Sequence, residues 1–310
     1  MAAGQSRTVN FQKKEESSKL VVPVLLVCSA AIAICMAFGN PVLWTPMPKS
    51  GGFTHLNSPN NQTPPDGFGE NGNNANEKEM ETIAEYRTIS QTENTERAEN
   101  LLLAAEAINR KEIAPGQTFS FNSAVGDVAN DNRYLEAPAV IKDEVKNSRG
   151  GGVAQVATAL YVAGLKAGLE VVERHAHGVP IDYASIGLDA AISYGSMDLV
   201  LKNTSTYPIH ISAEAVGQTV WVRIIGQPLG EGNTIGAASM IVDRLNDRSE
   251  RIEPDAVIDP SQTIYYVVES YRIYYKDATK IEQQYLFSDT YKASPDVLLI
   301  LESGGFDPLT

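Results

Sequence analysis

Cysteine is nearly absent from this chain of 310 residues, since Cys28 and Cys35 are the only two and everything after residue 38 is cysteine-free. A disulfide framework, a thiolate metal site and a cysteine nucleophile are therefore excluded beyond residue 38. Histidine is scarce as well, with four residues in the whole chain. Any chemistry that uses imidazole must depend on very few positions.

Basic residues are outnumbered by acidic ones, and the formal net charge is −13. Residues 1–38 carry four basic and two acidic side chains, which leaves 21 basic against 36 acidic side chains in the remainder. This acidic remainder would be repelled by phosphate backbones, so we expect no nucleic-acid partner.

Residues 20–38 form an apolar run of nineteen residues without charge, long enough to cross a bilayer as a helix. Three lysines precede the run, and the next basic residue is Lys49. The positive-inside rule then leaves residues 1–19 in the cytoplasm and exports the rest of the chain. The alternative is a cleaved signal peptide, with Ala37-Phe38-Gly39 as its cleavage site. We predict the uncleaved anchor of a single-pass membrane protein.

Residues 39–79 are predicted to be a disordered linker. Between residues 40 and 76 there are six prolines, five glycines and eight asparagines. Such a composition buries too little apolar surface to offset the entropy of ordering the segment.

From residue 80 the hydrophobic periodicity predicts a globular region of the α+β class, with residues 80–228 as its main domain. Helices are predicted from a cap at Asn94 or Thr95 to about Arg110, and over 153–168. Alternation of apolar and polar residues predicts strands over 81–90, 118–121, 137–141, 169–174, 190–202, 207–213 and 218–226.

The most informative stretch is the glycine run Gly150-Gly151-Gly152, which opens directly onto the second helix. Several free backbone N–H groups converge at such a positive helix end. His175 and His177 follow some twenty residues later. This layout is typical of papain-like and transglutaminase-like enzymes, which place a cysteine at a helix start and a histidine base on a strand. Here the corresponding first-turn residue is Ala154.

Three segments closely resemble the VanW family from about residue 83 to 226: INRKEIAPGQTFSFNSAVG, GGGVAQVATALYVAGLKAGLEVVERHAHGVPIDY and GLDAAISYGSMDLVLKNTSTYPIHI. The resemblance implies an anchored, extracytoplasmic bacterial protein from a family named for an accessory role in glycopeptide resistance. VanW-like sequences usually read GGGxCQxST. This chain departs from that pattern with Ala154 in place of the cysteine and Ala157 in place of the serine.

The first hypothesis is a former cysteine acyl-transfer or hydrolase site that has lost its nucleophile. Its base is His175 or His177, and the acid that orients the base is Asp189 or Asp198. The relict site comprises Ala154, Gln155, His175, His177 and Asp189. The residues predicted to bind a ligand are Gly150, Gly151, Gly152, Gln155, Thr158, Tyr161, His175, His177, Asp189 and Tyr194.

Two further hypotheses compete with the first. His175 and His177 on one strand face, with Glu173 or Asp189 as a third ligand, would suit a metal ion. Alternatively, the glycines only permit a tight turn, and the histidines pack within the fold. The His-x-His pattern by itself is weak, so we predict no metal and no other cofactor.

Residues 229–310 are predicted to be a β-rich tail, loosely similar to G5-like modules. An irregular connection over 227–262 precedes strands expected over 264–268, 271–276, 281–287 and 297–301. Seven of the thirteen tyrosines lie between residues 265 and 291. They are expected either to pack across strands or to stack on sugar rings.

The sequence therefore predicts a membrane-anchored, extracytoplasmic VanW-like protein of the cell envelope. Its expected partner is peptidoglycan or a peptidoglycan precursor, which it binds without catalysis, as a pseudoenzyme or scaffold. The alternative is a hydrolase or acyl transferase acting on peptidoglycan peptides, or a histidine-based metal-dependent site.

Overall fold

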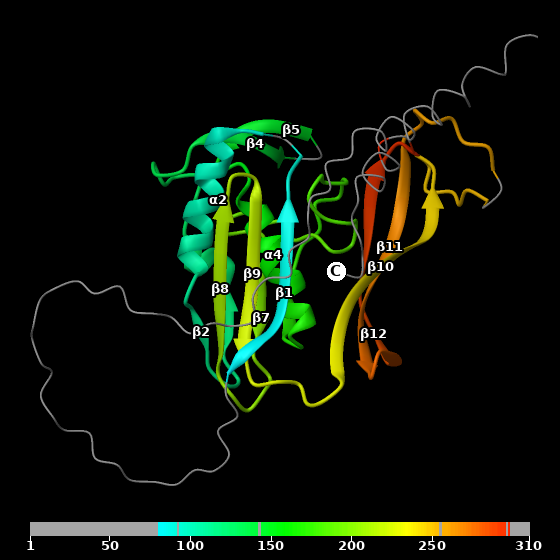
Figure 1. The fold of residues 1–310 in the computed structure, drawn as a ribbon. Helices are drawn as coiled ribbons and strands as arrows, with labels where there is room; N and C mark the ends of the chain where they lie inside the picture. Colours follow the sequence, from blue (N-terminus) through cyan, green and yellow to red (C-terminus); the bar gives the residue numbers. More distant parts are fainter. Residues whose placement is uncertain (1–79, 92, 142–143, 254–255, 296, 298–310) are drawn as a thin grey trace, which may run out of the picture. The chain divides into compact units, whose positions relative to one another are not determined.

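The computed structural model describes residues 80–91, 93–141, 144–253, 256–295 and 297. The predicted membrane span and linker, residues 20–79, lie outside the described part of the chain. Within the described part, no helix is both long and apolar enough to cross a membrane. Helices and several antiparallel sheets are mixed along the chain, which confirms the α+β class (Figure 1).

A four-stranded antiparallel sheet forms the scaffold of the first part of the fold. Its strand order is β1 (Glu81–Ile89), β9 (Thr219–Gly226), β8 (Ile209–Val216) and β2 (Glu112–Ile113). Along β8 and β9 buried and less buried side chains alternate. This period of two explains why the sequence predicted both strands.

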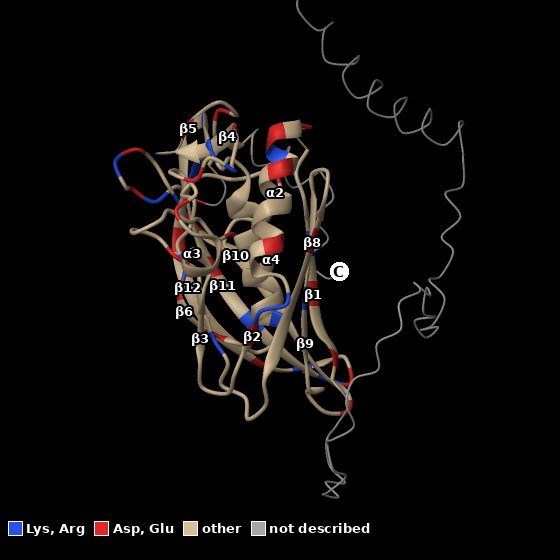
Figure 2. Ribbon diagram, turned by 90° about the vertical axis from the view of Figure 1, so that its left-hand side faces the viewer, with Lys and Arg blue, Asp and Glu red and all other residues tan. Residues whose placement is uncertain are grey.

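Two helices, α2 (Thr95–Ile108) and α4 (Val153–Lys166), cover one face of this sheet (Figures 1 and 2). Asn94 caps α2, because its side chain accepts a hydrogen bond from the Arg97 backbone N–H at 2.7 Å. Helix α4 carries only one charged side chain, Lys166. Strands pack on both sides of α4, and nearly all of its side chains are buried. It is therefore the central helix of the hydrophobic core.

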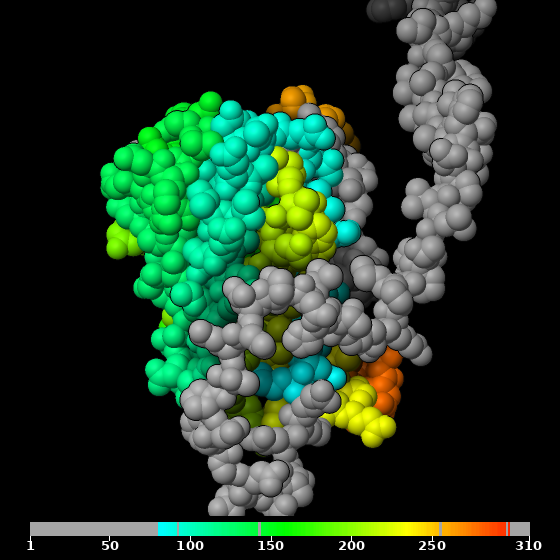
Figure 3. Space-filling model, turned by 60° about the vertical axis from the view of Figure 1, so that its left-hand side comes forward, coloured from blue at the N-terminus to red at the C-terminus, as the bar shows by residue number. Residues whose placement is uncertain are grey.

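The loops around α4 are organised by two small sheets. The first has the order β3 (Thr118–Ser120), β7 (Val200–Lys202) and β6 (Glu170–Glu173), and the second pairs β4 (Glu136–Ile141) with β5 (Glu144–Arg149). In Figure 3 the segment that includes β4 and β5 adjoins the surface of α2. There the Asn100 side chain of α2 donates to the backbone oxygens of Leu135 at 2.9 Å and Gly151 at 3.0 Å.

Two of the predicted strands are wrong in extent. The strand expected over 190–202 is confined to β7, because the chain turns between Ser193 and Met197 and the Asp198 carboxylate accepts from the backbone N–H of Asn122 at 2.8 Å. The strand expected over 118–121 stops at Ser120. The Ser120 side chain caps a short helix, α3 (Phe121–Val125).

The tail contains one three-stranded antiparallel sheet, β10 (Asn233–Leu245), β11 (Ile264–Lys276) and β12 (Thr279–Ala293). The irregular connection predicted over 227–262 is wrong where β10 forms. The two strands predicted over 264–276 are one continuous strand, since the polar Ser270 is buried and its hydroxyl donates to the Gly187 carbonyl at 2.7 Å. Residues 298–301 of the last expected strand lie outside the described part of the chain.

This tail sheet is bonded directly to the central helix. Arg272 of β11 is buried, and its Nε donates to the Leu165 carbonyl at 3.1 Å, while Nη2 donates to the Leu169 carbonyl. Leu165 is in the last turn of α4, where its carbonyl also accepts from the Gly168 backbone N–H at 3.1 Å and the helix dipole favours a cation. The tail sheet therefore stabilises the C-terminal end of α4.

We predict that Arg272→Met lowers the free energy of unfolding by about 2 kcal/mol, because two buried carbonyls lose a charged donor. Chemical denaturation of the full chain measures the change. The matched control is Arg223→Met on β9, where the partly exposed ion pair with Glu85 should contribute less than about 1 kcal/mol. Equal losses in the two variants would contradict the capping role.

Candidate functional site

The glycine run before α4 is built by packing constraints. A Cβ on the buried Gly151 would lie 2.1 Å from the backbone oxygen of Ala137 in β4, so no larger residue fits there. Gly152, the N-cap of α4, has a φ of +103° and makes no side-chain capping bond. These contacts give the glycines a structural reason, and their role in ligand binding stays a prediction.

Ala154 lies in the first turn of α4 and is only partly buried. One turn later, Thr158 lies on the same helix face, at a Cβ separation of about 6 Å. Arg97 of α2 packs beside Gly152, and its guanidinium carbon lies 5.5 Å from the centre of the Tyr183 ring. Ala154 is not part of the fully buried core, and its proximity to the two histidines stays a prediction.

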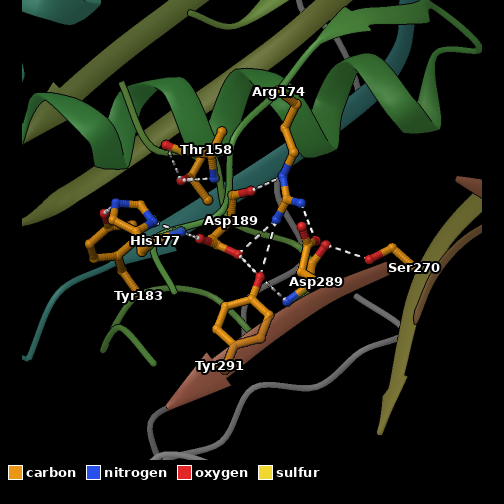
Figure 4. A network of polar contacts seen from close by, with 10 residues as sticks. Thr158, Arg174, His177, Tyr183, Asp189, Ser270, Asp289 and Tyr291 are labelled. Atoms are coloured by element: carbon orange, nitrogen blue, oxygen red, sulfur yellow. Dashed lines mark hydrogen bonds and ion pairs between the residues drawn. The ribbon is translucent and has the colours of Figure 1, made fainter. Parts of the chain in front are cut away.

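His177 and Asp189 form the hydrogen-bonded pair of this site (Figure 4). The Asp189 carboxylate is fully buried, and its Oδ2 accepts from the His177 backbone N–H at 2.8 Å and from Nδ1 at 2.6 Å. A carboxylate only accepts, so Nδ1 carries the proton. The other ring nitrogen, Nε2, lies 3.4 Å from the Tyr183 hydroxyl. Asp189 therefore fixes both the tautomer and the orientation of the imidazole.

The pair connects back to α4 through two neighbours. The backbone N–H of Ala190, next to Asp189, donates to the Thr158 hydroxyl at 3.0 Å. Thr158 also hydrogen-bonds Tyr183, whose phenol has its pKa raised by burial. The imidazole and the phenol are thereby joined to the Thr158 side chain of α4.

Arg174 supplies the counter-charge to Asp189. Its Nη2 donates to Asp189 Oδ1 at 2.9 Å and its Nε to the Asp189 backbone oxygen at 2.7 Å, with both side chains almost fully buried. Burial alone would raise the pKa of Asp189, but the hydrogen bond and charge of His177, the charge of Arg174 and a hydrogen bond from Tyr291 hold it well below its ordinary value. Asp189 is therefore ionised inside the fold.

The two histidines have different surroundings. His175 is partly exposed, and its Nε2 lies 2.9 Å from Glu173 Oε1, whereas His177 is buried against Asp189. The hydrogen bond from His175 and the backbone N–H of Asp198 lower the pKa of Glu173. Within the described ranges, no three His, Cys, Asp or Glu side chains are grouped so as to hold a metal ion.

The structure also distinguishes between the two candidate acids. Asp189 contacts His177, whereas Asp198 accepts hydrogen bonds at the start of α3 and from the backbone N–H of Leu199. Asp198 thus has a structural position, and Asp189 is the candidate acid that contacts a histidine; its role as the acid that orients a base stays a prediction.

The remaining predicted residues divide between interior and surface. Gln155 is fully buried, and both ends of its amide are engaged, by Arg97 Nη2 at 2.8 Å and by the Gln218 carbonyl at 2.9 Å. Tyr161 is buried against the Arg174 guanidinium, with 5.5 Å from the guanidinium carbon to the ring centre. Tyr194 is 57% exposed in the turn between Ser193 and Met197. A direct role of these three in binding stays a prediction.

Sequence reasoning missed Arg97, Arg174, Tyr183 and Tyr291. Arg174 and Tyr183 lie within ten residues of His177, and a basic or phenolic residue so close to a candidate base was a usable signal. Arg97 and Tyr291 come from distant elements, and no local pattern marks them.

Comparisons with known proteins agree on one segment of the chain. Residues 96–225 match the family model described as VanW like protein. "Uncharacterized protein YoaR" of Bacillus subtilis is 34% identical over 142 residues, which cover 46% of this chain and 47% of that protein. "Vancomycin B-type resistance protein VanW" of Enterococcus faecalis is 33% identical over 135 residues, which cover 41% of this chain and 47% of that protein. The chain thus spans about half the length of these relatives. No solved structure matches it.

The buried Asp189 makes stability depend on pH. Its folded-state pKa lies below the ordinary 3.8, so its contribution is fully present above about pH 4 and is lost as the pH falls through the lowered pKa. We predict that Asp189→Asn lowers the free energy of unfolding at pH 7 by about 3 kcal/mol, because Arg174 loses its buried partner. Between about pH 5 and pH 2, the stability of this variant should fall less steeply than that of the wild type.

Denaturation curves at a series of pH values test this, with Asp247→Asn as the control. Asp247 is exposed, and its variant should follow the wild-type pH dependence. An Asp189→Asn variant with the wild-type slope below pH 5 would show that Asp189 does not carry the acid sensitivity.

Proposed function

We propose, from the premise that the chain belongs to the VanW-like family through residues 96–225, that it binds peptidoglycan or its precursors at the cell envelope without catalysing a reaction. The relative from Enterococcus faecalis is named a vancomycin resistance protein. The extension from that name to a cell-wall ligand is part of the proposal.

The observation that carries the proposal is Ala154 in the first turn of α4, one turn before Thr158, which bonds Tyr183. VanW-like sequences usually place a cysteine at this position. Near a helix start, a thiol would have a lowered pKa and a histidine as its base. The methyl group of Ala154 cannot attack a carbonyl, so acyl transfer through this position is lost.

The polar groups that connect to α4 through Thr158 are nevertheless suited to hold a ligand. His177 Nε2 and the Tyr183 hydroxyl are polar groups of fixed orientation, since Asp189 holds the imidazole and Thr158 bonds the phenol. The first backbone N–H groups of α4 provide positive partial charge. The His177 side chain and Tyr183 are each only 6% exposed, so the proposal requires a peptide to displace the contact between His177 Nε2 and the Tyr183 hydroxyl before its amide and carboxylate groups can bond to them.

The location at the envelope rests on the sequence. The apolar run over 20–38, with lysines before it, supports a membrane anchor with an outward-facing C-terminal part. A linker over 39–79 would then tether the folded domain beside the membrane, within reach of the cell wall.

The His177–Asp189 pair favours an enzyme as the second candidate. An imidazole held by a buried carboxylate is the arrangement of a general base, and His177 would then activate a water molecule for hydrolysis of a peptidoglycan peptide. Turnover of cell-wall peptides by the wild type that is lost in His177→Ala would replace the binding proposal with this one.

For the binding test, the full chain is incubated with insoluble peptidoglycan and the retained fraction is measured. We predict that His177→Ala weakens retention roughly tenfold, since a lost charge-assisted hydrogen bond is worth about 1.5 kcal/mol. His175→Ala is the matched control, because His175 is partly exposed and bonds Glu173 instead of Asp189. No retention of the wild type, or equal retention of both variants, would refute binding at this site.

Restoring the thiol tests whether the site is a relict of a cysteine enzyme. The two native cysteines are first removed by Cys28→Ser and Cys35→Ser. In this background we predict that the alkylation rate of Ala154→Cys rises with a pH midpoint clearly below about 8.5, the ordinary pKa of a cysteine thiol, because the helix start and the imidazole lower the thiol pKa. Val145→Cys is the control, on a side chain that is 74% exposed in β5. Identical pH profiles for the two thiols would remove the case for a lost nucleophile.

A further inference from the structure

We infer that the tail sheet is part of the candidate site, and that Tyr291 and Asp289 of β12 are positioning residues for the His177–Asp189 pair. The family match ends at residue 225, and β12 covers Thr279–Ala293. The inference deepens the proposed function by adding a second structural unit to the same site. It rests on the geometry of the pair and needs no identified ligand.

Tyr291 contributes the first contact. Its side chain is fully buried, and its hydroxyl donates to Asp189 Oδ1. The Tyr291 hydroxyl oxygen accepts from the Gly187 backbone N–H at 2.8 Å, so the phenol must use its own proton toward the carboxylate. Burial, followed by the negative charge of Asp189, raises the pKa of Tyr291 and keeps the phenol protonated.

Asp289 contributes the second contact, through Arg174. The Asp289 carboxylate accepts from Nη1 of Arg174, while Nε and Nη2 of the same guanidinium are directed at Asp189. The planar guanidinium thus joins β12 to Asp189 through a fixed fork of donors. Figure 4 shows Arg174 between the two carboxylates, with Tyr291 approaching Asp189 from the strand.

Phe287 completes the arrangement, because its ring centre lies 5.6 Å from the guanidinium carbon of Arg174. Tyr161 of α4 lies on the same guanidinium at 5.5 Å. Phe287, Asp289 and Tyr291 are spaced two residues apart, so they share one face of β12. Side chains on this face of β12 therefore cover Arg174 and Asp189.

The consequence for the imidazole follows from the four side-chain and backbone donors that surround the Asp189 carboxylate. Oδ2 is held by His177, and Oδ1 by Arg174 and Tyr291. Without the Tyr291 hydroxyl, Oδ1 keeps only Arg174, and without Asp289 that guanidinium is itself less constrained. In either case the carboxylate can rotate, and the bond to His177 Nδ1 opens more often.

The test is nitrogen-15 NMR of the His177 side chain in the full chain. His177→Gln assigns the signal, because the chain has only four histidines. In the wild type we expect a protonated Nδ1 whose proton exchanges slowly with water. In Tyr291→Phe we expect exchange to be roughly tenfold faster, as befits the loss of one hydrogen bond to a charged group.

The matched control is Tyr266→Phe, since Tyr266 is a buried tyrosine of the same sheet and is paired in register with Tyr291. If Tyr291 is purely structural, Tyr291→Phe will lower the melting temperature but give the same His177 signal as the control. That result would overturn the inference. Asp289→Asn provides a second variant if Tyr291→Phe does not fold, and a wild-type His177 signal in Asp289→Asn overturns the inference equally.

The outcome is separable from that of the proposed function. Faster exchange at His177 in Tyr291→Phe, together with a wild-type chain that does not bind peptidoglycan, would refute the ligand and uphold the positioning role. Peptidoglycan binding by the wild type, together with an unchanged His177 signal in Tyr291→Phe, would uphold the ligand and refute the positioning role.

Discussion

The buried carboxylate of Asp189 is the interaction on which this structure depends. An ion without water is costly, and Asp189 is kept in the interior only because Arg174, His177 and Tyr291 all donate hydrogen bonds to it. The connection from Arg174 to Ala191 contains little regular structure. The course of this connection is set largely by Asp189. Through hydrogen bonds of Asp189 and of its neighbour Ala190, the connection is attached to the end of β6, to helix α4 and to the tail sheet.

The same network has two consequences of different kinds. It orients His177 as a general base would be oriented, and it stabilises the connection between two parts of the fold. The second does not require chemistry at Ala154. An ordered histidine–carboxylate pair in this protein is therefore compatible with a site that only binds.

Much of the fold followed from local patterns. The cap at Asn94, the apolar face of α4 and the alternation along β8 and β9 predicted those elements within a few residues. The strand predicted over 190–202 was wrong in extent. An alternating pattern cannot reveal that the Asp198 carboxylate will accept a hydrogen bond from the backbone N–H of Asn122 in the first turn of α3. Strand β10 was missed because its burial does not alternate, so its sequence lacks the period of two that marks a half-buried strand.

For the candidate site, the sequence by itself determined the inventory: no thiol beyond residue 38, an alanine at the helix start, and a histidine pair some twenty residues later. It also determined the glycine run before the second helix, whereas the close approach of Gly151 to β4, which admits no side chain, came from the tertiary structure. That His177 contacts Asp189, whereas His175 contacts Glu173 and Asp198 bonds at the start of α3, was decided only by the tertiary structure. So was the participation of Tyr291, because hydrogen bonds between residues about a hundred positions apart depend on how sheets and helices pack, and no local spacing encodes that packing.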